Sequence, residues 1–260
     1  MKTITCYHRL KPCFFLLLFF FNQLSTAADI PVIGSASSLK FALQDINKAF
    51  HQDTGNTVRI SYSSSGNLTR QIQQGAPFEL FLSANSLYVE QLVQQKKTLN
   101  KGIIYALGRL VLLTHKNSKL PLDEHLSGIK TSIESGQLQR FAIANPIHAP
   151  YGVAAREVLK HLELWNKTKP YLVLGENIAQ AAQFTSSGAA QVGLISYSLA
   201  LSPNLQNSTR SLLIPSSFHQ PLEQTMVLLN NAGATSKQFF AYLQQDKARA
   251  ILSQYGYSLP

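Results

Sequence analysis

Cysteine is nearly absent from this chain of 260 residues, which contains only Cys6 and Cys13. Both lie close to the N-terminus, so the rest of the chain has no thiol. Disulfides, zinc–thiolate sites and cysteine nucleophiles are therefore excluded from that part. Such a chain depends on its apolar core for stability, and about 230 residues are enough for one large core or two smaller ones.

The first residues have the pattern of a secretory signal peptide. Basic residues precede an unbroken apolar run at residues 13–21, and the small residues 25–28 (Ser-Thr-Ala-Ala) resemble a cleavage site. The apolar run is far shorter than the roughly 20 residues that span a bilayer, which disfavours a membrane anchor. We expect removal of residues 1–28, with cleavage near Ala27 or Ala28, and export of a soluble protein.

Acidic residues are scarce as well. Asp and Glu number 13 against 23 Lys and Arg, which gives a net charge of +10. Three of the cations lie in the expected signal peptide, which has no acid, so the mature chain carries +7. Its cations are scattered along the sequence, whereas a nucleic-acid-binding face would gather them. We expect a solvated basic surface that mildly attracts anions, and no nucleic-acid partner.

Motifs of several enzyme classes are missing. The sequence has no Gly-x-Ser-x-Gly nucleophile elbow, no His-Glu-x-x-His metal motif and no Gly-x-x-x-x-Gly-Lys phosphate loop. The histidines after the expected signal peptide are widely spaced and form no metal-ligand pattern. We therefore expect a protein that is not an enzyme and has no cofactor.

Short apolar segments alternate with helical patterns along the mature chain. Strands are predicted at residues 31–33, 57–61, 78–82, 110–114, 141–144, 171–174, 192–195, 211–214 and 224–229. Helices are predicted at residues 39–52, 68–73, 86–95, 153–164, 178–185 and 236–255. This alternation indicates an α/β architecture with mainly parallel sheets flanked by helices.

Two serine-rich junctions each follow a predicted strand and precede a predicted helix. They are residues 34–39 (Gly-Ser-Ala-Ser-Ser-Leu) and residues 61–68 (Ser-Tyr-Ser-Ser-Ser-Gly-Asn-Leu). A serine loop at a helix N-terminus offers hydroxyl groups, free backbone N–H groups and the positive end of the helix dipole. Two such junctions in one sheet predict a single anion held between them, although a lone serine run is more often a simple loop or helix cap.

The order of elements predicts two lobes. An apolar strand begins just after Gly108, and the chain returns to another apolar strand near residue 225. One lobe would comprise residues 29–108 and 225–260, and residues 109–224 would form a second lobe inserted into it. Ligands of open α/β sheets bind beyond the carboxyl ends of the strands. The cleft between the lobes is then the expected site, and both serine junctions lie at that end of their strands.

Five segments, in this order, resemble the periplasmic molybdate-binding proteins of ABC transporters. They are residues 36–39 (Ala-Ser-Ser-Leu), 64–77 (Ser-Ser-Gly-Asn-Leu, continuing to Gly-Ala-Pro), 79–84 (Glu-Leu-Phe-Leu-Ser-Ala), 145–155 (Asn-Pro, Ala-Pro-Tyr-Gly and Ala-Ala) and 254–257 (Gln-Tyr-Gly-Tyr). The resemblance covers nearly the whole mature chain. It implies the two-lobed, venus-flytrap fold of type II periplasmic binding proteins, which hold tetrahedral molybdate or tungstate with serine hydroxyls and backbone N–H groups.

The resemblance also implies positions for the residues that bind the oxyanion. Ser38 would donate from the first junction and Ser65 from the second. Tyr151 stands where the family usually has alanine and uses its backbone N–H, and Ile178 would be a second backbone donor at the start of its helix. The metal would be held only as the oxyanion, through Ser38, Ser65, Tyr151 and Ile178.

The sequence leaves a fifth contact open. Family members that use a tyrosine hydroxyl have it two residues after an apolar residue that follows glycine. Here residues 193–197 (Gly-Leu-Ile-Ser-Tyr) place Ser196 at that position and Tyr197 one residue later. A shift of one residue on a strand reverses the face, so either Ser196 or Tyr197 donates, or neither does.

The resemblance implies a monomeric receptor that captures molybdate or tungstate and delivers it to an ABC permease in the inner membrane. A doubly charged tetrahedral oxyanion carries no proton at neutral pH, so neutral donors suit it and a carboxylate does not. The alternative is a binding protein for another anion, such as sulfate. Phosphate keeps a proton at neutral pH and would call for a carboxylate acceptor, and none adjoins either serine junction.

Overall fold

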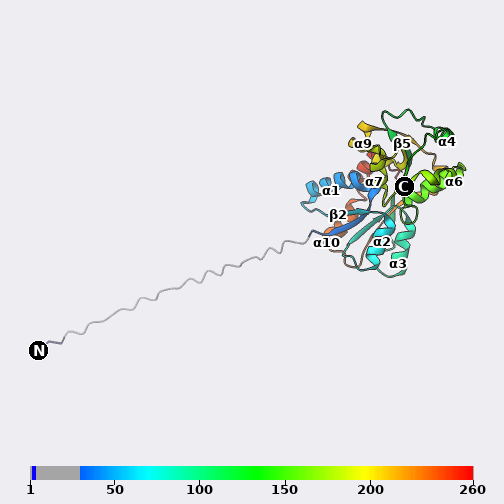
Figure 1. The fold of residues 1–260 in the computed structure, drawn as a ribbon. Helices are drawn as coiled ribbons and strands as arrows, with labels where there is room; N and C mark the ends of the chain where they lie inside the picture. The colour runs from blue at the N-terminus through cyan, green and yellow to red at the C-terminus, as the bar shows by residue number, and fades with distance from the viewer. Residues whose placement is uncertain (1, 4–29, 260) are drawn as a thin grey trace.

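The computed structural model describes residues 2–3 and 30–259 of the chain. They form two lobes, each built on one five-stranded sheet that is flanked by helices (Figure 1). The apolar run and cleavage site of the expected signal peptide lie outside the described residues. Among the described residues, no helix is both long enough and apolar enough to cross a membrane.

The first sheet has the strand order β2-β1-β3-β10-β4. Its strands are β1 (Val32–Ala36), β2 (Arg59–Ser63), β3 (Leu80–Ser83), β4 (Ile103–Gly108) and β10 (Leu222–Leu228). The first three run parallel, and β10 is antiparallel to β3 and β4. The register pairs Ala36 with Ser63. The two serine junctions therefore leave the sheet side by side at one edge.

The second sheet has the strand order β7-β6-β8-β5-β9. Its strands are β5 (Leu110–His115), β6 (Phe141–Ala144), β7 (Leu172–Gly175), β8 (Val192–Ser196) and β9 (Thr209–Leu213). Strand β6 runs parallel to β7 and β8, while β5 is antiparallel to β8 and β9. Ala144 pairs with Gly175, so the loops after β6 and β7 also start side by side.

Helices fill the connections and cover the sheets. They are η1 (Ser37–Leu39), α1 (Lys40–Thr54), α2 (Ser65–Gln73), α3 (Ser86–Gln94), α4 (Ser127–Glu134), α5 (Pro150–His161), α6 (Trp165–Thr168), η2 (Lys169–Tyr171), α7 (Ile178–Ser186), α8 (Tyr197–Ala200), α9 (Pro203–Ser208), η3 (Ser216–Phe218), α10 (Ala234–Tyr242) and α11 (Asp246–Gln254). In Figure 1, α2 and α3 lie in the lower lobe and α4 and α9 in the upper lobe.

The chain passes between the sheets at two adjacent places. It leaves the first sheet after Gly108 and re-enters it at Leu222, and these two residues pair in the register of β4 and β10. On the other side of the passage, the Ile214 N–H donates to the Leu110 carbonyl oxygen. The two crossings therefore form one narrow connection between the lobes. The residue bounds that the sequence predicts for each lobe stay a prediction.

The C-terminal return segment packs on α1. The ring of Phe50 makes an edge contact with Phe239 of α10, with ring centroids 5.1 Å apart. Asp53, near the end of α1, accepts hydrogen bonds from the Tyr242 hydroxyl and from Lys247 Nζ. This part of the chain thus completes the core of the first lobe.

Candidate functional site

The two serine junctions bring hydroxyls and helix N-termini to the same place. Ser38 lies in η1, directly after β1, and Ser65 is the first residue of α2, directly after β2. Ser64 is the N-cap of α2, and its hydroxyl accepts from the Asn67 N–H at 3.4 Å. The local pattern of strand, serine and helix is therefore formed as the sequence predicts.

The second lobe supplies two further helix N-termini. Tyr151 is the second residue of α5, after the N-cap Ala149, and Ile178 is the first residue of α7, after the N-cap Asn177. Ser38, Ser65, Tyr151 and Ile178 line one small cavity between the lobes. The other residues that line it are Ala36, Ser37, Ser63, Ser64, Ala84, Ala149 and Pro150. Four of the six binding residues predicted from the sequence are thus brought together.

The cavity has the electrostatics of an anion site. The first N–H groups of a helix have no acceptor within that helix, which leaves those of Ser65, Tyr151 and Ile178 available. The positive ends of the α2, α5 and α7 dipoles converge there, and none of these helices has an acidic residue in its first turn. Among the described residues, no charged side chain lines the cavity.

The serine hydroxyls are also placed to donate. Ser38 Oγ is buried beside the hydroxyls of Tyr151 and Tyr257, and it has no hydrogen-bond partner of normal geometry among the described residues. Ser65 Oγ accepts from the Ala84 N–H at 3.0 Å, which leaves its own proton free. A buried hydroxyl without a partner costs free energy, so Ser38 is poorly satisfied unless a ligand accepts from it. The donor set is therefore neutral and matched to an acceptor that carries no proton.

Direct contacts between the lobes close the cavity. The Ala179 N–H of α7 donates to Ser37 Oγ at 3.3 Å, and Ser198 Oγ donates to the Ser38 carbonyl oxygen at 2.8 Å. All the lining residues except Ser63 are buried. The structure is therefore that of the closed arrangement of the lobes.

The side chain of Tyr151 extends from the cavity toward the connection between the lobes. It is buried, and a Cβ on Gly108 would lie only 2.2 Å from its hydroxyl oxygen. Burial raises the pKa of Tyr151 well above its usual value, so the hydroxyl is neutral. That hydroxyl has no hydrogen-bond partner of normal geometry among the described residues. The backbone N–H of Tyr151 lies at the helix N-terminus, and its hydroxyl lies beside Ser38 and Tyr257.

Ser196 and Tyr197 do not line the cavity. Ser196 is the last residue of β8, and its Oγ lies 3.3 Å from Ser198 Oγ. The ring of Tyr197 points elsewhere, since a Cβ on Gly256 would lie 2.5 Å from its Cδ1. The structure therefore separates these two predicted residues from the other four.

Sequence reasoning missed residues that act across the lobes. The Tyr257 hydroxyl donates to Ser198 Oγ at 3.1 Å, and Ser198 in turn holds the Ser38 carbonyl. Burial raises the pKa of Tyr257 to about 12. His148, on the loop before α5, contacts Ser64 and Gly66 of the first lobe. Of these residues, Tyr257 belongs to a segment that resembles the family, but that resemblance did not predict its contact with Ser198.

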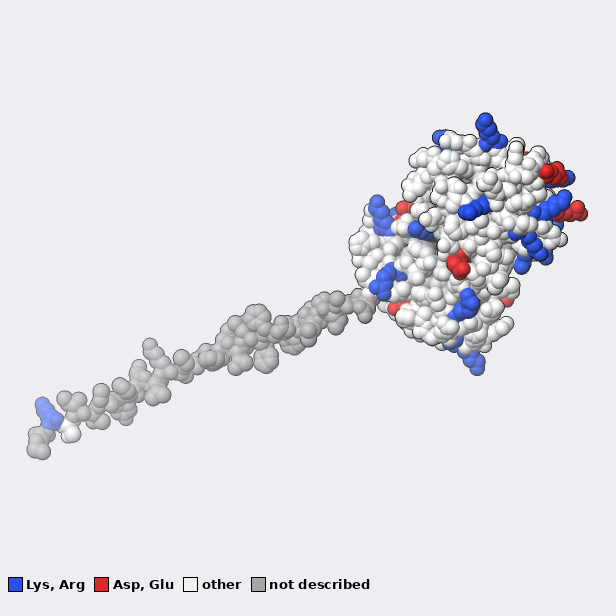
Figure 2. Space-filling model, viewed as in Figure 1, with Lys and Arg blue, Asp and Glu red and all other residues white. Residues whose placement is uncertain are grey.

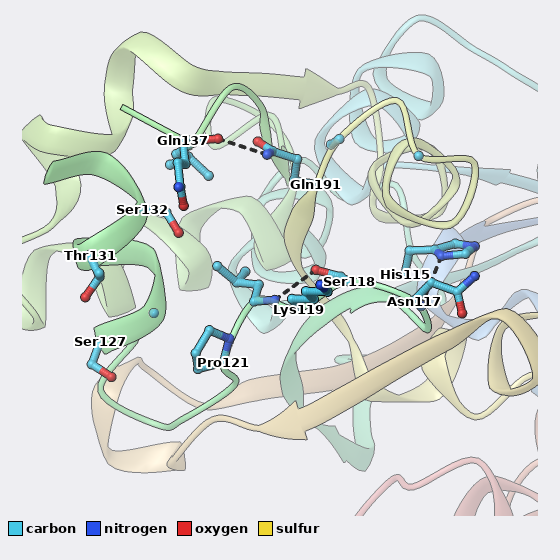
Figure 3. Close-up of a pocket in the computed structure, with 15 residues that line it drawn as sticks. His115, Asn117, Ser118, Lys119, Pro121, Ser127, Thr131, Ser132, Gln137 and Gln191 are labelled. Atoms are coloured by element: carbon cyan, nitrogen blue, oxygen red, sulfur yellow. Dashed lines mark hydrogen bonds between the residues drawn. The ribbon is translucent and has the colours of Figure 1, made fainter. Parts of the chain in front are cut away.

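A larger hollow, of about 630 Å³, lies in the second lobe between the β5–α4 loop and Gln191. Figure 3 shows the Gln191 amide bonded to the Gln137 main chain, at 3.0 Å. The α4 N-terminus borders this hollow, but the Asp123 carboxylate already accepts from the N–H groups of Ser127 and Gly128. The helix N-terminus at this hollow is therefore already capped by a carboxylate, unlike those at the cavity between the lobes.

The charged side chains stay outside the cavity. On the face shown in Figure 2, Lys and Arg are dispersed over both lobes and form no continuous stripe. Such a surface attracts anions weakly over distance, and the neutral donors between the lobes then provide the directional contacts.

Comparison with known proteins agrees with this geometry. Residues 32–258 match the family model described as bacterial extracellular solute-binding protein. The molybdate-binding protein ModA of Rhodobacter capsulatus is 32% identical over 237 residues, which are 90% of this chain and 90% of that protein. ModA of Azotobacter vinelandii is 32% identical over 236 residues, covering 90% of this chain and 91% of that protein.

A solved structure supports the same assignment. The periplasmic molybdate-binding protein of Azotobacter vinelandii superposes with a TM-score of 0.81 and 30% sequence identity, covering 88% of this chain and 99% of that one. Sequence and fold agree with these relatives over about nine-tenths of the chain. The chain therefore belongs to the bacterial extracellular solute-binding proteins and is a relative of the molybdate-binding proteins among them.

Proposed function

We propose that this protein binds molybdate or tungstate between its two lobes and delivers the oxyanion to an ABC permease. The observation that carries the proposal is the convergence of three helix N-termini and two serine hydroxyls on a cavity whose described lining has no charged side chain. The similarity to molybdate-binding proteins over nine-tenths of the chain gives the ligand class. No covalent chemistry is involved.

Each donor in the cavity has a proposed role. Ser38 and Ser65 donate through their hydroxyls, and Tyr151 and Ile178 donate through their backbone N–H groups. A hydrogen bond to a charged partner contributes about 1.5–3 kcal/mol net. Several such bonds, less the cost of immobilising the ligand, reach the roughly −12 kcal/mol of nanomolar binding.

The lobes close on the anion because the closed form offers more contacts. Residues 29–108 and 225–260 form one lobe in this proposal, and residues 109–224 form the other. The anion shifts the population toward the closed form by the free energy of the contacts that exist only there. Contacts such as that between Ser198 and Ser38 then stabilise the closed state together with the ligand.

The cellular setting follows from the same reading. We propose that residues 1–28 are removed on export and that the mature protein acts as a periplasmic monomer. It would carry the oxyanion through the periplasm to the permease in the inner membrane. The relatives with which it aligns along nine-tenths of its length support this role.

Calorimetry and thermal melting of the purified mature protein test the proposal. The ligands are molybdate, tungstate, sulfate and phosphate, each added to the same preparation. Molybdate and tungstate should release or absorb heat and raise the melting temperature, since a ligand at a hundred times its dissociation constant adds roughly 2.7 kcal/mol of stability. Binding of sulfate without binding of molybdate or tungstate would refute the proposal.

A further inference from the structure

His148 lies at the contact between the lobes, beside the cavity. Its carbonyl oxygen accepts from the Gly66 N–H at 2.9 Å, and its ring Nδ1 lies 2.9 Å from Ser64 Oγ. On the other side of the ring, Nε2 lies 3.5 Å from a carboxylate oxygen of Glu176. The imidazole is therefore held between a hydroxyl of the first lobe and a carboxylate of the second.

Glu176 determines which nitrogen of the neutral ring carries the proton. A carboxylate favours an N–H group facing it, so neutral His148 has its proton on Nε2 and an acceptor at Nδ1. Ser64 must then donate its only hydroxyl proton to Nδ1. When the ring is protonated, the Nδ1–H donates to Ser64 Oγ. The Ser64 hydroxyl then keeps its proton but is free to donate it in a hydrogen bond to another acceptor.

Ser64 is placed to donate its hydroxyl proton to a ligand in the cavity. It is buried and lines the same cavity as Ser38 and Ser65. Its oxygen already accepts from the Asn67 N–H at 3.4 Å. With His148 protonated, both lone pairs of the oxygen are used, and the hydroxyl proton is free to turn toward a ligand.

We propose that Ser64 is a further hydrogen-bond donor to the bound oxyanion. His148 is the positioning residue, because its protonation frees the Ser64 hydroxyl to turn toward the anion. This inference rests on the proposed function, because it requires a doubly charged oxyanion between the lobes. If the proposal holds, the protein takes up a proton when it binds the anion. In the complex, His148 is charged and the Ser64 hydroxyl points toward the anion.

The groups that face His148 set the range of pH. Burial holds the pKa of His148 below its usual value, Glu176 beside Nε2 opposes this, and Arg70 of α2 lowers the pKa further. A doubly charged anion in the adjoining cavity stabilises the charged ring and raises the pKa in the complex. A pKa that is higher in the complex means that binding takes up a proton and tightens as the pH falls through this range.

Calorimetric titration with molybdate from about pH 6 to about pH 8.5, on both sides of the usual histidine pKa, tests the inference. The affinity of the wild-type protein should rise toward the acidic end, about tenfold for each unit by which the ligand raises the pKa. The heat of binding should also depend on the ionisation enthalpy of the buffer, because a proton is taken up. This second measurement needs no variant.

Substitutions separate the two residues. His148→Asn places an uncharged amide near the position of Nδ1, so its affinity should not depend on pH and its heat should not depend on the buffer. Ser64→Ala should lose most of the gain in affinity at the acidic end. His51→Asn, an exposed histidine on α1, is the matched control and should keep the wild-type profile.

Two charge substitutions should move the profile in opposite directions. Glu176→Gln removes the charge that favours protonation, so the transition should move to lower pH. Arg70→Gln removes a charge that opposes protonation, so the transition should move to higher pH. Shifts in the same direction, or no shifts, would overturn the assignment of the transition to His148.

The remaining outcomes separate this inference from the proposed function. Wild-type protein that binds molybdate equally well across the range, without proton uptake, refutes the role of His148 and leaves the proposed function standing. Unchanged affinity of Ser64→Ala at about pH 6 refutes the donor role of Ser64. Absence of molybdate and tungstate binding at every pH refutes the proposed function and this inference with it.

Discussion

The Gly66 N–H donates to the His148 carbonyl oxygen at 2.9 Å, which joins the two lobes through their main chains. A Cβ on Gly66 would lie 2.7 Å from that oxygen, closer than side chains approach in folded proteins. Glycine is therefore required at this position for the lobes to meet as they do.

Gly66→Ala should weaken ligand binding without weakening the fold. Alanine favours a helix over glycine by up to about 1 kcal/mol, so the ligand-free protein should melt at the same or a higher temperature. The clash in the closed form should cost about 1–3 kcal/mol, which raises the molybdate dissociation constant roughly 5- to 150-fold. Calorimetry and ligand-free melting measure the two effects. Wild-type affinity in this variant would show that the bound form does not use this contact.

Ser38→Ala should also weaken binding and leave the ligand-free protein as stable as before. The Ser38 hydroxyl has no hydrogen-bond partner of normal geometry among the described residues, so its loss should change the stability of the fold little. The affinity should fall roughly 10- to 150-fold, the equivalent of one bond to a charged acceptor. Ser35→Ala is the control, because Ser35 is buried in β1 just before Ser38 but does not line the cavity.

Ser65→Ala should differ from Ser38→Ala in its effect on stability. Ser65 Oγ accepts from the Ala84 N–H, so the substitution leaves that buried donor unpaired. We expect a loss of about 1–3 kcal/mol in the free energy of unfolding, in addition to weaker binding. Urea denaturation of the two variants side by side measures the difference. Equal stability would contradict the hydrogen bond to Ala84.

Tyr151→Phe should leave molybdate affinity unchanged. The proposed contact uses the backbone N–H of Tyr151, and its buried hydroxyl has no partner of normal geometry. Removal of such a hydroxyl should leave stability unchanged or raise it slightly. A tenfold or larger loss of affinity in calorimetry would instead assign the hydroxyl to the ligand. Tyr257→Phe is the comparison, because it breaks the hydrogen bond to Ser198 and should reduce stability.

Asp53→Asn should destabilise the protein at neutral pH and have little effect in acid. Hydrogen bonds from Lys247 and then Tyr242 hold the pKa of Asp53 below its usual 3.8. A lowered carboxyl pKa stabilises the fold above the unfolded-state value, and this stability is lost as the pH falls through the folded-state value. Urea denaturation at neutral pH and well below pH 3.8 should show the variant and wild type converging in acid, with exposed Glu90→Gln as the control.

Most strands and helices follow from local patterns, and the exceptions have specific causes. Residues 103–108 were not predicted as a strand, because β4 lies at the edge of its sheet and pairs with segments far away in the sequence, namely β10 and Ser258. The helix predicted at 236–255 is instead two helices. Gln245 is extended between them, and Asp246 begins α11, where an acid suits the helix dipole.

Some residues of the candidate site have a local sequence signal, and others do not. The helix starts at Ser65 and Ile178 have a capping residue just before them, and the family resemblance predicted that both residues lie at the ligand. Ser198 and His148 act only when the lobes meet, and no local pattern encodes that meeting. The fifth contact was left open because Tyr197 is offset by one residue from the family pattern, and the structure places Ser196 and Tyr197 outside the cavity lining.

The absence of charged side chains from the described cavity has a kinetic consequence. Salt screens long-range attraction between exposed charges, but it acts weakly on buried dipoles. Added salt should therefore slow the arrival of the anion more than it hastens its departure. If departure requires the lobes to separate, the residence time is set by how often the contacts between them, including the bonds at Ser198 and Gly66, break together. A permease that pulls the lobes apart would release the cargo without altering a single ligand contact beforehand.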